Sequence, residues 1–453
     1  MALTVVCAQS TDDPGVPGNP RQAALVRCPP TRPNDFNGDG KRDLVAAYTW
    51  DVTTTRENGR VREIDGEREM LDGRPAPKGG FLTIVYGGSG RRQVISQSTP
   101  GVPGEPESED DFGSRAASAD LNGDGYSDLL VAATHEVSSE RPGDDVGLTG
   151  RITLLYGGRK GLTTSGARRF PNGGQPYTMA VSDLDCDGSP ELAVAYRERV
   201  RVYRNPATGD RLVAVTTLDH HDIVKSAVSD FTGDGYPDLA LFDVEHGIGS
   251  HLYVYKGSPG GLVSRPSLDS HLGFFDLDLA ADFDGDGRAE LVRREHSGQM
   301  DFLQMTADDK LRPLTTAVHP IGHFPEAIAV GDADGDGRTD LAIADLDETV
   351  VMYGGGRTLG ERRRQRFSAT CPGLPGDDEK GPVDLREPSV ALTDMDGDGR
   401  AELAFDMVGR AGAAAVCVLR GTAGGITTDG LRTVPLIGDN RQGMPHLHKV
   451  DLY

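Results

Sequence analysis

The sequence has few aromatic side chains and no long apolar run. Only 6% of its 453 residues are aromatic, one residue is tryptophan, and 37% are hydrophobic. A helical bundle or a coiled coil needs more apolar material than this composition offers. No segment approaches the roughly 18 to 20 apolar residues of a membrane-spanning helix, so we expect no membrane span.

Basic residues are scarce relative to acidic ones. The chain has 47 Lys and Arg residues against 70 Asp and Glu residues, a formal net charge of -23. A surface this acidic repels phosphate backbones and anionic lipids, so we expect no nucleic-acid partner. The same charge predicts that small cations bind.

Glycine and proline are abundant instead, with 60 and 28 residues. This composition is typical of short β-strands joined by many turns.

The N-terminus resembles the end of a secretory signal. Residues 1–8 lack a basic region, but Val6 and Ala8 stand at the -3 and -1 positions of a small-residue cleavage site before Gln9. We therefore expect a signal-peptide remnant over residues 1–8 and a secreted, extracellular protein. An ordinary ragged terminus is the alternative.

Removing Cys7 with that remnant would leave four cysteines, an even number that suits disulfides in a secreted protein. They are Cys28, Cys186, Cys371 and Cys417. The first expected pair is Cys371 with Cys417, although the connectivity stays open.

An acidic motif recurs seven times, about every 60 residues. Its copies, called loops 1 to 7 below, occupy residues 35–43, 120–128, 183–191, 230–238, 282–290, 332–340 and 394–402. Short strand-like segments precede and follow each copy, and a third such segment lies farther along each repeat. A repeat of this length matches one four-stranded propeller blade with its loops. We therefore predict an all-β fold, a single seven-bladed β-propeller of four-stranded antiparallel blades over residues 9–453.

Each loop offers oxygen ligands in one pattern. Positions one, three, five and nine carry oxygen side chains except where noted below, position seven can offer its backbone carbonyl, and position six is always glycine. The predicted metal ligands of loops 1 to 4 are Asp35, Asn37, Asp39, Lys41, Asp43, Asp120, Asn122, Asp124, Tyr126, Asp128, Asp183, Asp185, Asp187, Ser189, Glu191, Asp230, Thr232, Asp234, Tyr236 and Asp238. Those of loops 5 to 7 are Asp282, Asp284, Asp286, Arg288, Glu290, Asp332, Asp334, Asp336, Arg338, Asp340, Asp394, Asp396, Asp398, Arg400 and Glu402.

Oxygen-only ligands point to Ca²⁺, in up to seven copies, and the lack of thiolate or imidazole at these positions disfavours zinc and copper. The acid at position nine, followed by a strand, distinguishes the loop from an EF-hand, which needs Glu at position twelve between helices. Solvated acidic turns are the alternative. Two carboxylates about 4 Å apart repel by about 4 kcal/mol at an effective dielectric of 20, so empty loops would splay.

Two loops depart from the pattern. Thr232 replaces the acid or amide at position three of loop 4, which predicts a weaker site. Cys186 stands at position four of loop 3, where the other loops have glycine. Cys186 is interpreted as a tolerated small residue, with a disulfide as the alternative.

The run of Phe112 and Gly113, then residues 120–128, then Ala132 and Ala133 resembles the FG-GAP or VCBS repeat of integrin α-subunit propellers and bacterial secreted integrin-like proteins. This resemblance covers nearly the whole chain and implies a calcium-binding propeller used in adhesion. The Phe-Gly pair is intact only before loop 2 and no Gly-Ala-Pro follows, so the resemblance implies no particular ligand.

Four insertions are expected on the face opposite the loops, in the sector formed by blades 7, 1 and 2. They span residues 51–78, 98–111, 134–149 and 369–388 and contain 21 acidic and 9 basic residues. Tyr48 and Trp50 at the start of the first insertion form an aromatic pair suited to stacking on a sugar or an apolar side chain. The alternative is that the insertions are solvent-exposed loops that bind no ligand.

The sequence contains no recognisable catalytic constellation, so we expect a non-enzymatic, monomeric binding or adhesion module for a protein or carbohydrate ligand. The alternative is an extracellular polysaccharide lyase or hydrolase on the same scaffold, because propellers host unrelated chemistries. Two segments are candidates for the strand that closes the ring. Pro29, Pro30 and Pro33 argue against a strand before loop 1, so blade 1 must borrow one from residues 447–453 or 23–28.

Overall fold

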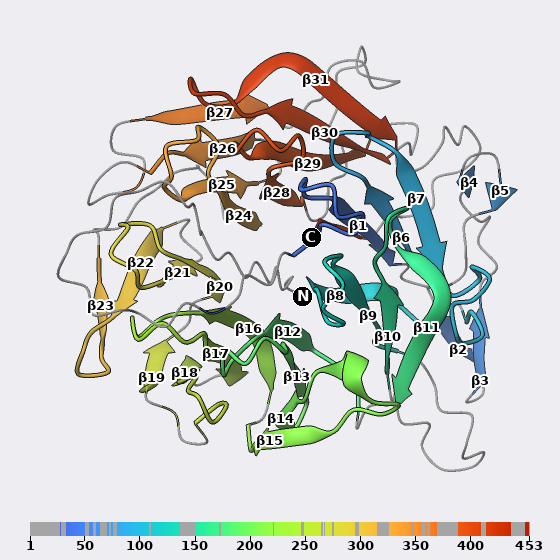
Figure 1. The fold of residues 1–453 in the computed structure, drawn as a ribbon, viewed down its shortest axis with the longest axis horizontal. Helices are drawn as coiled ribbons and strands as arrows, with labels where there is room; N and C mark the ends of the chain where they lie inside the picture. The colour runs from blue at the N-terminus through green and yellow to red at the C-terminus, as the bar shows by residue number, and fades with distance from the viewer. Residues whose placement is uncertain are drawn as a thin grey trace.

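The fold is seen in a computed structural model of the chain (Figure 1). It describes residues 28, 33–49, 54–57, 60–63, 70–71, 74–75, 79–107, 110–135, 150–171, 174–220, 222–245, 249–263, 266, 268–273, 276–294, 299–314, 326–345, 348–354, 359, 363–368, 388–408, 414–435 and 449–452. The expected signal remnant at residues 1–8, Trp50 and Cys371 lie outside these ranges.

Seven four-stranded antiparallel sheets form the blades, as predicted (Figure 1). From the axis outwards, blade 1 contains β32 (Lys449–Leu452), β1 (Leu44–Thr49), β6 (Phe81–Val85) and β7 (Arg92–Ser96). Blade 2 contains β8 (Phe112–Ala119), β9 (Asp128–Ala133), β10 (Arg151–Tyr156) and β11 (Thr163–Pro171). Blade 3 contains β12 (Thr178–Ser182), β13 (Glu191–Tyr196), β14 (Arg199–Tyr203) and β15 (Ala214–Leu218), with a short 3₁₀ helix η1 (Pro206–Thr208).

The remaining blades repeat this order. Blade 4 contains β16 (Ile223–Ser229), β17 (Asp238–Glu245), β18 (Gly249–Tyr255) and β19 (Leu268–Gly273). Blade 5 contains β20 (Asp276–Ala281), β21 (Glu290–Arg294), β22 (Met300–Met305) and β23 (Leu311–Pro313). Blade 6 contains β24 (Ala327–Gly331), β25 (Asp340–Ala344), β26 (Glu348–Met352) and β27 (Arg364–Ser368). Blade 7 contains β28 (Val390–Thr393), β29 (Glu402–Val408), β30 (Ala414–Arg420) and β31 (Thr427–Pro435).

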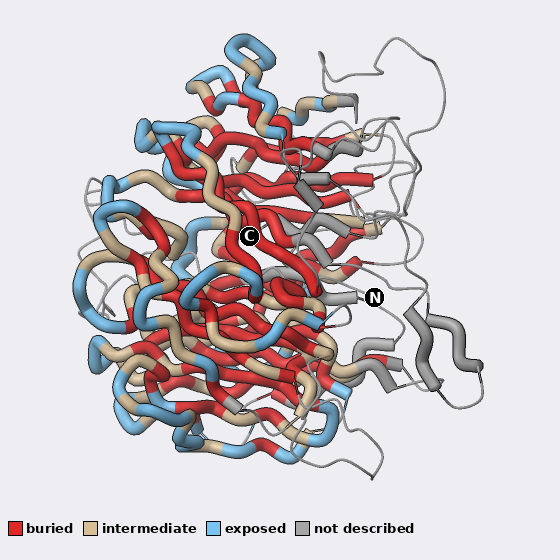
Figure 2. Tube along the Cα trace, turned by 90° about the vertical axis from the view of Figure 1, so that its right-hand side faces the viewer, coloured by how far each residue is buried: buried red, intermediate tan, exposed pale blue. Residues whose placement is uncertain are grey.

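The second strands β9 and β25 are mostly apolar because both of their faces are covered. β9 and β25 are buried along their whole length, whereas the outer strands β15 and β31 are mostly exposed. Figure 2 shows the buried residues running through the strands and the exposed residues gathered in the turns. The core is therefore divided into layers between neighbouring blades; one layer packs Leu44 and Phe81 of blade 1 against Ala404 and Val416 of blade 7.

The C-terminus closes the ring. β32 pairs antiparallel with β1, with Leu452 opposite Ala46 and Lys449 opposite Thr49. Of the two segments that the sequence left open, the structure thus uses the C-terminal one. The first and last described strands, β1 and β32, are therefore neighbours in one sheet, which pairs the inner edge of β1.

The insertions leave the blades on the face opposite the loops. The first three follow β1, β7 and β9, and the fourth follows β27, at connections that the strand order places away from the loops. The first contains two small hairpins, formed by β2 (Thr54–Glu57) with β3 (Arg60–Glu63) and by β4 (Met70–Leu71) with β5 (Arg74–Pro75). Among the described residues, no helix is long and apolar enough to cross a membrane.

A disulfide joins Cys28 to Cys186, across 158 residues of sequence. The interpretation of Cys186 as a tolerated small residue is therefore wrong, because its side chain is covalently bonded. Cys417 is also disulfide-bonded. The expected partner Cys371 lies outside the described residues. Structural disulfides persist in oxidising compartments.

Candidate metal centres

Loops 2 to 7 connect the first and second strands of their blades, loop 1 precedes β1, and each loop is folded by its own acids. The first aspartate accepts hydrogen bonds from backbone N–H groups at positions five and six; in loop 3, Asp183 accepts from Asp187 at 3.0 Å and from Gly188 at 2.8 Å. Position six requires glycine because the chain turns there with positive φ, +87° at Gly188 and +89° at Gly287. In each of the seven loops the first aspartate accepts from the N–H of the glycine at position six, which holds the turn.

Four loops bring three carboxylates together, with one oxygen of each lying within 4.8 Å of the others. These are Asp183, Asp185 and Glu191 in loop 3, Asp282, Asp284 and Glu290 in loop 5, Asp332, Asp334 and Asp336 in loop 6, and Asp394, Asp396 and Glu402 in loop 7. They are the four loops that carry four acids. The longer glutamate at position nine reaches the centre in loops 3, 5 and 7, whereas loop 6, with Asp340 there, uses position five instead.

Loops 1, 2 and 4 lack an acid at position three. Asn37 and Asn122 each donate a side-chain hydrogen bond to the aspartate at position five, at 3.1 Å and 3.0 Å. Thr232 occupies position three of loop 4. These loops therefore offer amide or hydroxyl oxygens in place of a charge. The assignments of the position-seven carbonyls stay predictions.

The acid at position nine has a second role that the sequence did not reveal. In loop 1, Asp43 accepts from the N–H of Phe36 at 3.0 Å and from the N–H of Gly87, just after the third strand, at 2.8 Å. Asp128 makes the same bond to Gly157, and Asp340 to Gly354. The acid thus fastens its loop to the third strand. The recurring Tyr-Gly at the ends of these third strands was the available signal, since a Cβ at Gly157 would lie 2.2 Å from the Ser127 carbonyl.

Burial and mutual repulsion raise the pKa of these carboxyl groups. Burial, followed by repulsion from neighbouring aspartates, raises the pKa of Asp43 to about 7 and that of Glu290 to about 8. The same causes raise the pKa of Glu191 and of Glu402 to about 7. A divalent cation among such oxygens would favour their ionised forms.

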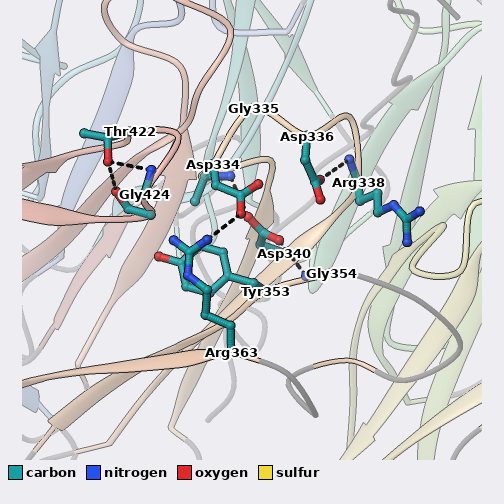
Figure 3. A network of polar contacts seen from close by, with 12 residues as sticks. Asp334, Gly335, Asp336, Arg338, Asp340, Tyr353, Gly354, Arg363, Thr422 and Gly424 are labelled. Atoms are coloured by element: carbon teal, nitrogen blue, oxygen red, sulfur yellow. Dashed lines mark hydrogen bonds and ion pairs between the residues drawn. The ribbon is translucent and has the colours of Figure 1, made fainter.

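Arginines lie against two of the clusters. Arg363 Nη1 is 3.0 Å from Asp334 Oδ2, and its guanidinium lies 4.0 Å from the ring centre of Tyr353 (Figure 3). In loop 7, Arg420 Nη2 is 3.1 Å from Asp398 Oδ2. Loops 6 and 7 therefore have positive charge of their own, which sequence spacing gave no means of predicting.

Two side-chain oxygens at position three indicate whether the loops are suited to a cation. Asp334 Oδ1 and Thr232 Oγ1 are buried and have no hydrogen-bond partner among the described residues. The Asp334 side chain is only 10% exposed. Buried oxygens without partners are costly, and here they lie in loops whose other donors are also oxygens. The donor set therefore fits a hard divalent cation such as Ca²⁺.

The repeats also match known families. A family model described as FG-GAP-like repeat matches residues 183–241, 230–293 and 282–343, and one described as FG-GAP repeat matches residues 112–155. The chain is an FG-GAP repeat propeller. The matched segments contain loops 2 to 6, and the structure extends the same blade to loops 1 and 7.

Two curated relatives of this FG-GAP propeller are phosphatidylinositol-glycan-specific phospholipases D. The Homo sapiens protein is 32% identical over 182 residues, covering 33% of this chain and 20% of that protein. The Rattus norvegicus protein is 32% identical over 187 residues, covering 39% of this chain and 17% of that protein. The matched part therefore spans at most about a fifth of these relatives.

Among solved structures, an Agrocybe aegerita lectin described as recognising non-reducing terminal N-acetylglucosamine is similar in fold. It is 13% identical with a TM-score of 0.52, covering 88% of this chain and 92% of the lectin. At this identity the similarity shows the fold alone.

Proposed function

We propose that this FG-GAP propeller is a secreted, monomeric binding or adhesion module whose loops hold structural Ca²⁺ and whose ligand is a protein or a carbohydrate. The carrying observation is that the carboxylate clusters repeat around the ring. Three-carboxylate groups occur in loops 3, 5, 6 and 7, and raised carboxyl pKa values occur in all seven loops. A catalytic centre would concentrate such groups at one place, whereas repetition supports a structural role.

Calcium would act on the blades through the loops. Loops 2 to 7 join the two innermost strands of their blades, and the ninth residue also holds the third strand in blades 1, 2, 4 and 6. A cation bound at the loop would therefore fix three strands at one end. Isothermal titration of metal-free protein, with a count of bound calcium by elemental analysis, tests this role. Absence of binding at millimolar calcium would contradict it.

The ligand would bind on the insertion face. The strand order supports this place, because three insertions leave from blades 1 and 2, the fourth connects blade 6 to blade 7, and all four lie on the face opposite the loops. Their acidic composition favours a ligand with basic or hydroxyl groups. Tyr48 lies in β1, next to the first insertion, and Trp50 follows it in sequence.

A glycan array and a panel of extracellular matrix proteins, each probed with and without chelator, test the binding role. Terminal N-acetylglucosamine is included because the lectin of similar fold recognises it. We expect Tyr48→Ala with Trp50→Ala to abolish binding. The control is Val215→Ala, an exposed position of the outer strand β15 away from the loops, which should leave binding unchanged. Equal binding by the double variant and the wild type would refute the proposed face.

The second candidate is an extracellular hydrolase or lyase. The relatives are named as phospholipases, and blade 4 carries one cluster of imidazole and phenol groups. The His220 ring centre lies 4.1 Å from that of Tyr253, whose hydroxyl is 3.4 Å from Asp243 Oδ2. Assays on polysaccharides and phosphodiesters, with His220→Gln as the inactive variant and His251→Gln beside it, test this candidate. Turnover unaffected by both variants would reject the cluster as its site.

A further inference from the structure

Neighbouring loops are fastened to each other by a backbone hydrogen bond. The N–H at position eight donates to the carbonyl at position one of the preceding loop: Ser127 to Asp35 at 2.9 Å, Ala289 to Asp230 at 2.8 Å and Ala401 to Asp332 at 2.6 Å. Arg42 donates to Asp394 at 2.9 Å in the same way and so joins blade 7 to blade 1. This backbone hydrogen bond is therefore present at four of the seven contacts between neighbouring blades.

Loops 3 and 4 cannot make this bond. Their eighth residues are Pro190 and Pro237, and proline has no backbone N–H. Between blades 2 and 3, the side chain of Asn205 compensates by donating to the Leu121 carbonyl at 2.7 Å. Between blades 3 and 4, Pro237 leaves position eight without a backbone donor.

The Cys28–Cys186 disulfide lies at that joint. Cys186 belongs to loop 3, and the Sγ atoms of Cys28 and Cys186 lie 3.3 Å and 4.0 Å from the carbonyl oxygen of Gly235 in loop 4. These are packing contacts, because a disulfide sulfur carries no hydrogen to donate. The disulfide therefore ties loop 3 to Cys28 and packs against loop 4, at the contact where Pro237 can donate no backbone hydrogen bond.

The bonded cysteine also lies between two of the proposed ligands. Cys186 separates Asp185 from Asp187 and has a φ of +59°, in the left-handed region that the glycines at position four occupy, with +76° at Gly285. A residue with a Cβ disfavours this conformation, so the covalent bond helps to hold it. Asp183 beside it is 2% exposed, the only first-position acid in the buried class among the seven loops.

We propose that the Cys28–Cys186 disulfide sets the calcium affinity of loop 3, which makes this loop alone sensitive to thiol reductants. The inference rests on the proposed calcium function. A dithiol reductant supplies two electrons and two protons; the S–S bond breaks, two thiols form, and the reductant becomes a disulfide. Cys186 then loses the bond that fixes the backbone between Asp185 and Asp187, so the ligands are less well preorganised. Cys28 and Cys186 are thus positioning residues for the cation.

Loop 5 is a matched internal control, because it carries the same four acids at positions one, three, five and nine with Gly285 at position four. Hydrogen exchange of peptides spanning residues 183–191 and 282–290, measured against calcium concentration, reports a binding midpoint for each loop. In Cys28→Ser, and in wild-type protein treated with dithiothreitol, we expect the loop 3 midpoint to rise about tenfold while that of loop 5 changes less than twofold. Cys28→Ser with Cys186→Gly should recover part of the affinity, because glycine adopts the positive φ without strain.

The outcomes separate the inference from the proposed function. A loop 3 midpoint within twofold of wild type in both Cys28→Ser and the reduced protein overturns the inference, provided that alkylation confirms free thiols. Equal weakening of loops 3 and 5 also overturns it, because the effect would then be a general loss of structure. If neither loop responds to calcium in oxidised wild-type protein, the proposed function itself fails, and this inference with it.

Discussion

The hydroxyl of Tyr353 in blade 6 accepts a hydrogen bond from the backbone N–H of Ile426 in blade 7, at 2.8 Å. Tyr86 in blade 1 makes the same bond to Leu162 in blade 2, also at 2.8 Å. Both tyrosines reach the next blade over a glycine; a Cβ at Gly161 would lie 1.9 Å from the Tyr86 hydroxyl. The third strand of one blade is thus fastened to the turn of the next.

Removing either hydroxyl should destabilise the ring. Tyr86→Phe removes the acceptor of the buried Leu162 N–H, which costs about 1 to 3 kcal/mol. In Tyr353→Phe the Ile426 N–H keeps Gln365 Oε1 as an acceptor at 3.0 Å, so we expect a smaller loss. The control is Tyr156→Phe at the equivalent position of blade 2, where the hydroxyl has only a long 3.4 Å contact from Arg168. Urea denaturation should show a lower free energy of unfolding for the first two variants, and equal values for all three would refute the interblade role.

The charge of the side chain at position three should determine which loops bind calcium most tightly. Asp284→Asn gives loop 5 the amide found in loops 1 and 2, so we expect its calcium affinity to fall about tenfold, because fewer charged ligands bind Ca²⁺ more weakly. Asn37→Asp should strengthen loop 1 by a similar factor. Calorimetric titration of both variants and of Asp308→Asn, an exposed acid outside the loops, measures the effect. Calcium affinities that are unchanged in both Asp284→Asn and Asn37→Asp would contradict the ligand assignment.

Arg363 should compete with the cation in loop 6. Its ion pair with Asp334 supplies positive charge where calcium would bind (Figure 3). Arg363→Gln should therefore raise the calcium affinity of loop 6 and lower the melting temperature of the metal-free protein. Arg364→Gln, at the exposed neighbouring position, should do neither. A fall in calcium affinity in the Arg363 variant would show that the arginine assists binding instead.

The metal-free protein should lose stability as pH rises. The pKa of Asp43 is raised to about 7 and that of Glu290 to about 8, chiefly by burial, whereas unfolded carboxyls titrate near pH 4. The folded state therefore binds more protons between about pH 4 and pH 8, and the stability that these groups contribute is lost across that window. Calcium should reverse the trend, because it binds the ionised carboxylates. Melting curves at about pH 5.5 and about pH 8, with and without calcium, check both signs. A metal-free melting temperature that rises with pH would contradict the raised pKa values.

The repeat pattern was enough to predict the blades and the places of the loops. Residues 183–191 and their six counterparts all lead into the second strand of a blade, because glycine and acids at fixed spacing specify this turn locally. The closing strand was ambiguous, since residues 449–452 are too short to be chosen over residues 23–28 without knowing where the chain ends meet.

Long-range side-chain contacts were beyond reach of the sequence. The partner of Cys186 lies 158 residues away, so spacing favoured the nearer pair Cys371 and Cys417. Arg363 directly precedes the outer strand β27, and its contact with Asp334 joins residues 29 positions apart, which no local pattern of the sequence indicates.

The central claim is that the loops hold divalent cations. The most direct measurement is anomalous diffraction from crystals grown in calcium, collected at a wavelength where calcium scatters anomalously. The account predicts peaks among the carboxylates of loops 3, 5, 6 and 7, with weaker ones in loops 1, 2 and 4. Well-ordered loops without anomalous density at any of the seven positions would contradict it.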